Sequence, residues 1–181
     1  MDLDFTFPLL SRLFVDLQFQ RALWNASSFV VSPSATKLPG ILAESRSEDP
    51  RVRRIAVQGI GDGLNRVARA DGVEALVCWS AVVGAMFDPA PSVVTLSLDL
   101  IAKEAHVPDE LAKVVSDRLN LLFRQAGRDV RVTVARACRR LSERAEGWPE
   151  ILDILENAQR DRSWLVRDAA VVQREPPGRP T

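Results

Sequence analysis

The chain has very few of the residues on which catalytic and metal sites usually depend. Its 181 residues include one histidine, His106, and two cysteines, Cys78 and Cys138. Both cysteines lie in apolar stretches without CxxC or metal-ligand spacing, so we expect reduced, buried core residues. His106 has no serine or cysteine motif beside it, and we expect it in a surface loop. The sequence therefore predicts no catalytic residue, no cofactor and no metal site.

Signals for export and membrane insertion are also missing. The N-terminus "MDLDFTFPLL" carries two aspartates where a signal peptide needs positive charge. No apolar run approaches the roughly 18 residues of a membrane span. Lys+Arg and Asp+Glu are each 24, so only a local patch could attract nucleic acid or a membrane. We expect a cytoplasmic protein with no membrane segment.

Enzyme signature motifs are absent as well, including HExxH, the P-loop and GxSxG. The segment "GIGDG" at 59–63 resembles a phosphate-binding loop only superficially, because it follows no strand and lacks the P-loop lysine. We expect it to mark a helix bend or a close contact between helices.

A junction between a turn and a helix recurs four times along the chain. The copies read "DPRVRRIAVQGI", "DPAPSVVTLSLDLI", "GRDVRVTVARACRRL" and "DRSWLVRDAAVV". Their aligned valines are Val52, Val93, Val130 and Val166, at intervals of 41, 37 and 36 residues. Each copy begins with an aspartate that could cap a helix, and proline follows in two copies. These residues are Asp49, Pro50, Asp88, Pro89, Asp129 and Asp161. Four residues after the valines stand Ala56, Ser97, Val134 and Ala170, mostly small residues that would let helices approach closely.

A further helix with an apolar stripe is expected between successive junctions. The first stripe consists of Val73, Leu76, Val77, Ser80, Val83 and Phe87. The second consists of Leu111, Val114, Val115, Leu119 and Leu122, and the third of Ile151, Ile154 and Leu155. An isolated pair of helices of this kind could not bury its apolar faces, so the pattern predicts stacked helical hairpins.

This pattern resembles the HEAT-repeat family of α-solenoids over roughly residues 34–172. The resemblance rests on an acidic residue, often proline, then valine and arginine at the start of each second helix, although Val94 replaces arginine and Pro91 intrudes in the second copy. It implies an all-α fold, an α-α superhelix of about four hairpins, with the repeat domain at 33–172. It also implies that Arg53, Arg131 and Arg167 are structural residues, each bonded to the aspartate of an adjacent unit.

The two ends of the chain do not fit the repeat. Residues 1–32 are expected to form an N-terminal capping segment, with a helix from about Pro8 to Trp24 favoured over a β-hairpin of "LDFTF" and "FVDLQF". Residues 173–181 read as a disordered tail.

Arginine is concentrated between residues 124 and 144. The cluster consists of Arg124, Arg128, Arg131, Arg136, Arg139, Arg140 and Arg144. These residues are candidate partner-binding residues, either for phosphate or as members of an internal salt-bridge lattice. We expect a non-catalytic scaffold that binds another protein on the concave face formed by the second helices. The alternative is a nucleic-acid-binding protein that uses this cluster. The sequence leaves the oligomeric state open.

Overall fold

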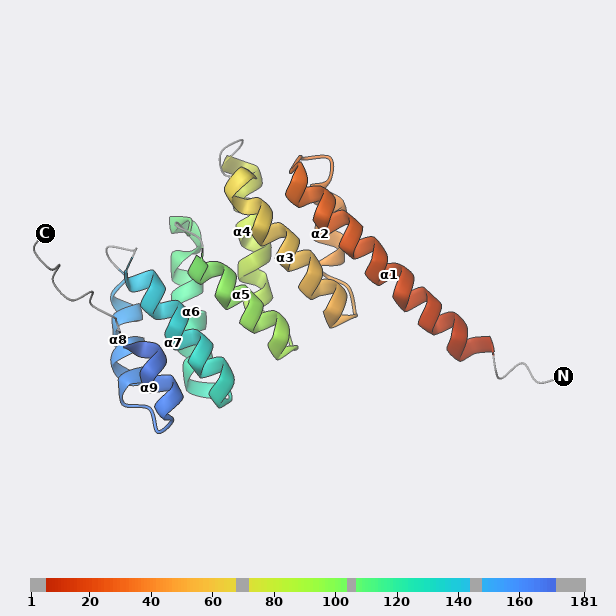
Figure 1. The fold of residues 1–181 in the computed structure, drawn as a ribbon. Helices are drawn as coiled ribbons and strands as arrows, with labels where there is room; N and C mark the ends of the chain where they lie inside the picture. The colour runs from red at the N-terminus through yellow and green to blue at the C-terminus, as the bar shows by residue number, and fades with distance from the viewer. Residues whose placement is uncertain (1–5, 68–71, 104–106, 144–147, 172–181) are drawn as a thin grey trace, which may run out of the picture. The chain divides into compact units, whose positions relative to one another are not determined.

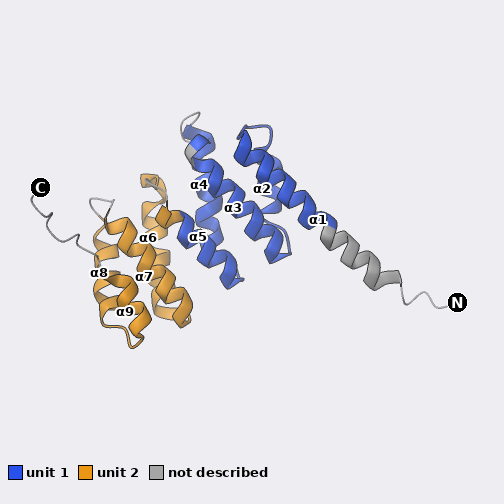
Figure 2. Ribbon diagram, viewed as in Figure 1, with its two compact units in different colours: residues 1–100 blue, residues 101–181 orange. Residues whose placement is uncertain are grey.

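The structure, a computed structural model, describes residues 6–67, 72–103, 107–143 and 148–171 (Figure 1). Side chains are described from residue 17 onwards within these ranges, apart from residues 65 and 67. The predicted all-α fold is confirmed, since every regular element in the described ranges is helical. The chain divides into two compact units, Met1–Leu100 and Ile101–Thr181 (Figure 2). The predicted tail at 173–181 lies outside the described residues.

Unit 1 is built on the packing of its first long helix against the third. Its elements are α1 (Thr6–Val31), α2 (Leu38–Glu44), α3 (Pro50–Val67), α4 (Gly72–Gly84), the short 3-10 helix η2 (Ala85–Phe87) and α5 (Pro91–Lys103), whose last residues belong to unit 2. Helix α1 packs along α3, and α2 and α4 also pack against α3. The core includes Phe29, Ile41, Ile60 and Leu64, which are almost completely buried.

Unit 2 is built around α7. Its helices are α6 (Asp109–Gln125), α7 (Arg128–Ser142), α8 (Pro149–Gln159) and α9 (Trp164–Ala170). Helix α7 packs against α6, α8 and α9. The predicted stripe of α8 is correct, because Ile151, Ile154 and Leu155 are buried. In α6 the predicted stripe is correct at Val115, Leu119 and Leu122, which are also buried, and wrong at Val114, which is exposed.

The first segment is a helix, and the β-hairpin alternative is wrong. Helix α1 also continues to Val31, well past the predicted end near Trp24. The side chain of Asn25, the first residue past the predicted end, donates from Nδ2 to Oε1 of Glu44 in α2, at 2.7 Å. Asparagine often ends helices, but this tertiary contact keeps Asn25 within α1.

The stripe predicted for α4 and the residues after it is correct at Val83, which is buried, but is otherwise mostly on the wrong face. Val73 and Phe87 are more than half exposed, whereas Cys78, Trp79 and Val82 are buried. Helix α4 is apolar nearly all the way round, so its periodicity does not select one face. Packing against the neighbouring helices makes that choice.

The four aligned junctions place their valines and small residues as expected. Val52, Val93 and Val166 are buried, and Val130 is half-buried. Ala56, Ser97, Val134 and Ala170 have no exposed surface. Pro91, which seemed to intrude, is the first residue of α5 and matches Pro50 at the start of α3, whereas Pro89 precedes α5. Proline suits a first helical turn because that turn leaves its N–H groups without intrahelical partners.

Candidate protein-binding site

Two arginine–aspartate pairs of the same construction tie helices together, one in each unit. In unit 1, Arg53 of α3 donates from Nε and Nη2 to the carboxylate of Asp88, at 2.6 and 2.8 Å. In unit 2, Arg131 of α7 donates from the same two atoms to Asp161, at 3.0 and 3.3 Å. In both arginines, Nη1 turns back to backbone carbonyls just before its own helix. Arg53 and Arg131 are thus structural residues.

The four aspartates of the junctions are not equivalent, which corrects the prediction that each starts its copy in the same way. They precede the aligned valines by 3, 5, 1 and 5 residues. Asp49 caps α3, because its Oδ1 accepts the Arg51 N–H at 2.8 Å. Asp129 lies inside the first turn of α7, is largely exposed and contacts Arg128. Only Asp88 and Asp161, both five residues before their valines, bind an arginine of an earlier helix.

The pairs keep their carboxylates ionised. The Arg53 guanidinium holds the pKa of Asp88 below its usual range, against the opposing effect of burial, with help from the Ala90 N–H. Burial favours the neutral form of Asp161, but the Ser163 N–H and Arg131 outweigh it and lower the pKa of that carboxyl. The Asp88 carboxylate in turn raises the pKa of Arg53.

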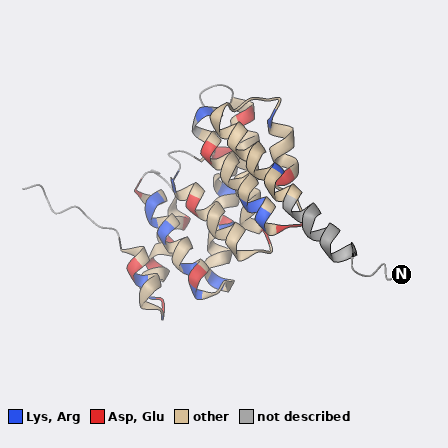
Figure 3. Ribbon diagram, turned by 45° about the vertical axis from the view of Figure 1, so that its right-hand side comes forward, with Lys and Arg blue, Asp and Glu red and all other residues tan. Residues whose placement is uncertain are grey.

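The arginine cluster is not one continuous cationic surface in the part of the chain that the structure describes. Arg131 is largely buried in its pair with Asp161, and Arg128 bonds Asp129. Arg124 donates to Asn120 in α6, and Arg139 lies near Glu143 and donates to the Val171 carbonyl. Arg136 is exposed and Arg140 half-exposed. Basic and acidic positions are interspersed along the helices (Figure 3). Arg144 lies outside the described residues.

An open apolar groove lies in unit 1 between α1 and α3. It has a volume of about 530 Å³ and is lined by Leu23, Ala26, Ser27, Val30, Val31, Arg54, Ile55, Gln58, Gly59 and Asp62. Most of the surface of its wall is apolar, and the polar side chains of Arg54, Gln58 and Asp62 stand along the α3 side. The Gln58 amide donates to Asp62 Oδ1 at 2.9 Å, so this edge carries an ordered polar pair.

Glycines allow the two helices of this groove to lie unusually close. A Cβ atom on Gly59 would lie 2.7 Å from Cβ and 2.9 Å from Cα of Ala26, and a Cβ on Gly63 would lie 2.6 Å from the Phe29 ring. Gly61 faces Leu100 in the same way. Of the two interpretations of "GIGDG", close helix contact is therefore correct, and α3 continues through it.

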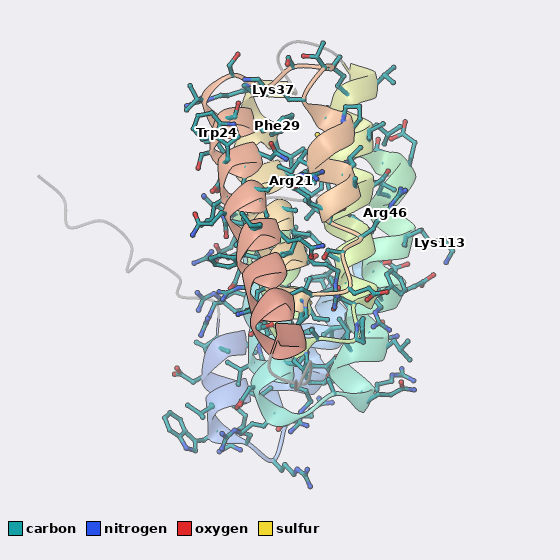
Figure 4. The ribbon with its side chains drawn as sticks, turned by 90° about the vertical axis from the view of Figure 1, so that its right-hand side faces the viewer. Arg21, Trp24, Phe29, Lys37, Arg46 and Lys113 are labelled. Carbon is teal, nitrogen blue, oxygen red and sulfur yellow. The ribbon has the colours of Figure 1, made fainter. Side chains whose placement is uncertain are left out.

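Helix α1 presents apolar side chains on two opposite faces. Ala26 and Phe29 face inward, whereas Trp24 and Val31 are 75% and 76% exposed (Figure 4 labels Trp24 and Phe29). Leu17, seven residues before Trp24, is also largely exposed. Positions seven apart lie on the same helix face. Leu17, Trp24 and Val31 are spaced seven residues apart, so this exposed apolar face of α1 is visible in the sequence.

Within the described ranges, the cysteine and carboxylate side chains do not cluster into a metal site. Burial raises the pKa of Cys78 to about 11 and that of Cys138 to about 12, so both thiols stay protonated near neutral pH. No three histidine, cysteine or carboxylate side chains gather as a metal site within the described ranges. His106 lies outside them.

Comparison with known proteins does not assign a family. Neither a protein-family model nor a curated protein sequence matches the chain. Among the helices of the described ranges, none is long and apolar enough to cross a lipid bilayer.

Proposed function

We propose that this chain is a non-catalytic protein-binding scaffold, built as a HEAT-like α-solenoid, that holds a helix of another protein in the groove between α1 and α3. The observation that carries the proposal is the groove itself, an apolar channel with a polar edge on a framework of packed helices. Such a groove suits an amphipathic helix, whose apolar face fills the channel while its polar face meets the edge.

The solenoid part of the proposal rests on the two arginine–aspartate pairs and on the buried valines of the junctions. Arg53 and Arg131 each lie in the first turns of a helix, and each binds the aspartate that precedes a later helix, so both units use the same contact between successive helices. In the proposed solenoid, α3 is one of the second helices that line the concave face. The groove would then lie on the face that we expect to bind a partner.

The balance of charge favours a protein over a nucleic acid. Several arginines of the cluster already have partners within their own helices or unit, and the groove wall is apolar rather than cationic. Nucleic-acid binding instead depends on neutralising many phosphates with free lysines and arginines.

A charge placed in the groove tests the proposal. Val31→Asp adds a carboxylate to an exposed position in the groove wall, and Leu152→Asp makes a comparable change on α8 of unit 2, where Leu152 is 60% exposed. Both variants should fold like the wild type. The tagged full chain is purified from its native cells, the co-purifying protein is identified, and its affinity for each variant is measured.

We expect Val31→Asp to weaken binding by about tenfold or more, because burying a carboxylate in a largely apolar interface costs more than 1 kcal/mol of binding free energy. Leu152→Asp should bind as the wild type does. Equal affinity of the two variants, or the consistent absence of any protein partner, would contradict the proposed function.

A further inference from the structure

Arg167 of α9 has the same anchored geometry as Arg53 and Arg131 but no carboxylate partner within the described residues. Its Nη1 donates to the carbonyls of Asp161 and Arg162, at 2.8 and 3.2 Å. These acceptors lie six and five residues before the arginine, just as Ser47 and Glu48 lie before Arg53. In Arg53 and Arg131 this anchoring leaves Nε and Nη2 to bind an aspartate. In Arg167 the same two atoms make no such bond to any residue that the structure describes.

The helix face that carries Arg167 is apolar and open. Trp164 and Val171, three residues before and four after Arg167, share its face and are 64% and 50% exposed. The opposite face, with Val166 and Ala169, is buried. Asp168, next to Arg167, is also exposed and would repel a carboxylate placed directly over it. The open face thus combines two large apolar side chains with a positioned guanidinium.

Helix α7 carries an arginine, Arg131, that already has a carboxylate partner next to a packed helix. Helix α9 packs against α7, and Asp161, three residues before α9 begins, reaches Arg131. Asp88 stands three residues before α5 and reaches Arg53 in the same way. Oδ1 of each of these aspartates also accepts the N–H two residues on, which orients the carboxylate toward its arginine. An aspartate three residues before a helix therefore binds an arginine of an earlier helix once in each unit.

We propose that the outer face of α9 binds a helix of another protein that is preceded, three residues before its first turn, by an aspartate. The aspartate bonds Nε and Nη2 of Arg167, and the apolar side of the helix packs on Trp164 and Val171. The site lies in unit 2 and does not depend on the groove proposed for unit 1. Its specificity comes from the bidentate carboxylate pair, a geometry that lysine cannot provide.

The test uses a labelled synthetic peptide with the sequence of residues 88–103, because this segment offers an aspartate to Arg53 in the chain itself. Its affinity for the full chain is measured by fluorescence anisotropy. The matched variants are Arg167→Gln and Arg162→Gln, which remove the same charge from neighbouring exposed positions. A second peptide replaces the leading aspartate with asparagine. Circular dichroism checks that the variants keep their helices.

We expect Arg167→Gln to weaken binding about tenfold, the size of a charge-assisted hydrogen-bonded pair. Arg162→Gln should have little effect. The asparagine peptide should bind the wild type about tenfold more weakly than the aspartate peptide does. The two peptides should bind Arg167→Gln with the same affinity. Unchanged binding to Arg167→Gln, or no binding to the wild type up to the solubility limit of the peptide, overturns the inference.

Two other occupants give distinguishable results, and either would overturn the inference. If sedimentation shows that the wild type self-associates and Arg167→Gln does not, the face binds a second copy. If Glu175→Gln strengthens peptide binding, a carboxylate of the chain's own C-terminal segment occupies it. The Val31→Asp variant should bind the peptide as tightly as the wild type does. The α9 site can therefore be tested even if the groove proposal fails.

Discussion

The contact between α1 and α3 gives the sharpest test of how this structure is held together. Gly59→Ala adds one methyl group where the nearest atoms are Cβ and Cα of Ala26, at 2.7 and 2.9 Å. Ordinary contacts between such atoms are about 3.5–4.0 Å, so α1 would have to move away by the better part of an ångström. Ala26 Cα belongs to the backbone, and no side-chain rotation relieves the clash.

Two effects of opposite sign set the magnitude. Overpacking of a well-packed contact costs about 1–3 kcal/mol, and the backbone atom places this site in the upper part of that range. Alanine in place of glycine inside a helix contributes about 1 kcal/mol in the stabilising direction. We therefore expect Gly59→Ala to lower the free energy of unfolding by about 1–2 kcal/mol.

Gly84→Ala is the matched control. Gly84 ends α4 with a helical φ of −56°, and a Cβ there meets nothing within 4 Å. This substitution should stabilise the protein by about 0.5–1 kcal/mol through helix propensity and the unfolded chain alone. Urea unfolding followed by circular dichroism measures both variants, with the slope checked for constancy. A Gly59→Ala protein as stable as Gly84→Ala would refute the close-contact reasoning.

Three further predictions concern the arginine pairs, the thiols and the arginine cluster. Asp88→Asn should destabilise the protein by about 2 kcal/mol at neutral pH, because it leaves the part-buried Arg53 without its carboxylate. Since the pKa of Asp88 is lowered in the folded state, the pair contributes fully above the ordinary aspartate pKa of about 3.9 and its contribution is lost as the pH falls through the lower folded value. The stability difference in urea between wild type and variant should therefore shrink below about pH 4, and a difference that stays constant would contradict the pairing. Cys78 and Cys138, with pKa values raised to about 11 and 12, should react with a thiol reagent at pH 8 only after unfolding, and rapid labelling of the native protein would disprove their burial. Duplex and single-stranded DNA should show no salt-sensitive binding at low ionic strength; an affinity that falls steeply with salt and depends on residues 124–144 would instead favour the nucleic-acid alternative.

The sequence alone was enough to predict the all-α fold, the starts of several helices and part of the core. Breakers such as Pro50, Pro91 and Pro149 stand at helix starts, and regular apolar spacing identified the buried face of α8. These are local properties, because helix propensity and the 3.6-residue period act over neighbouring turns. In α4 apolar side chains surround the helix, so local properties do not distinguish its buried face from its exposed one. The predicted stripe was mostly wrong there.

The tertiary structure decided which residues of the repeated junction meet. Spacing along the chain places aspartate and arginine near helix starts, but the translation of one helix along another determines that Asp88 and Asp161 are bonded while Asp49 caps its own helix. The α1–α3 groove likewise depends on the close approach at Gly59, which is a distance between segments far apart in sequence. Such distances follow from the packing of all neighbouring side chains together, and no local pattern contains them.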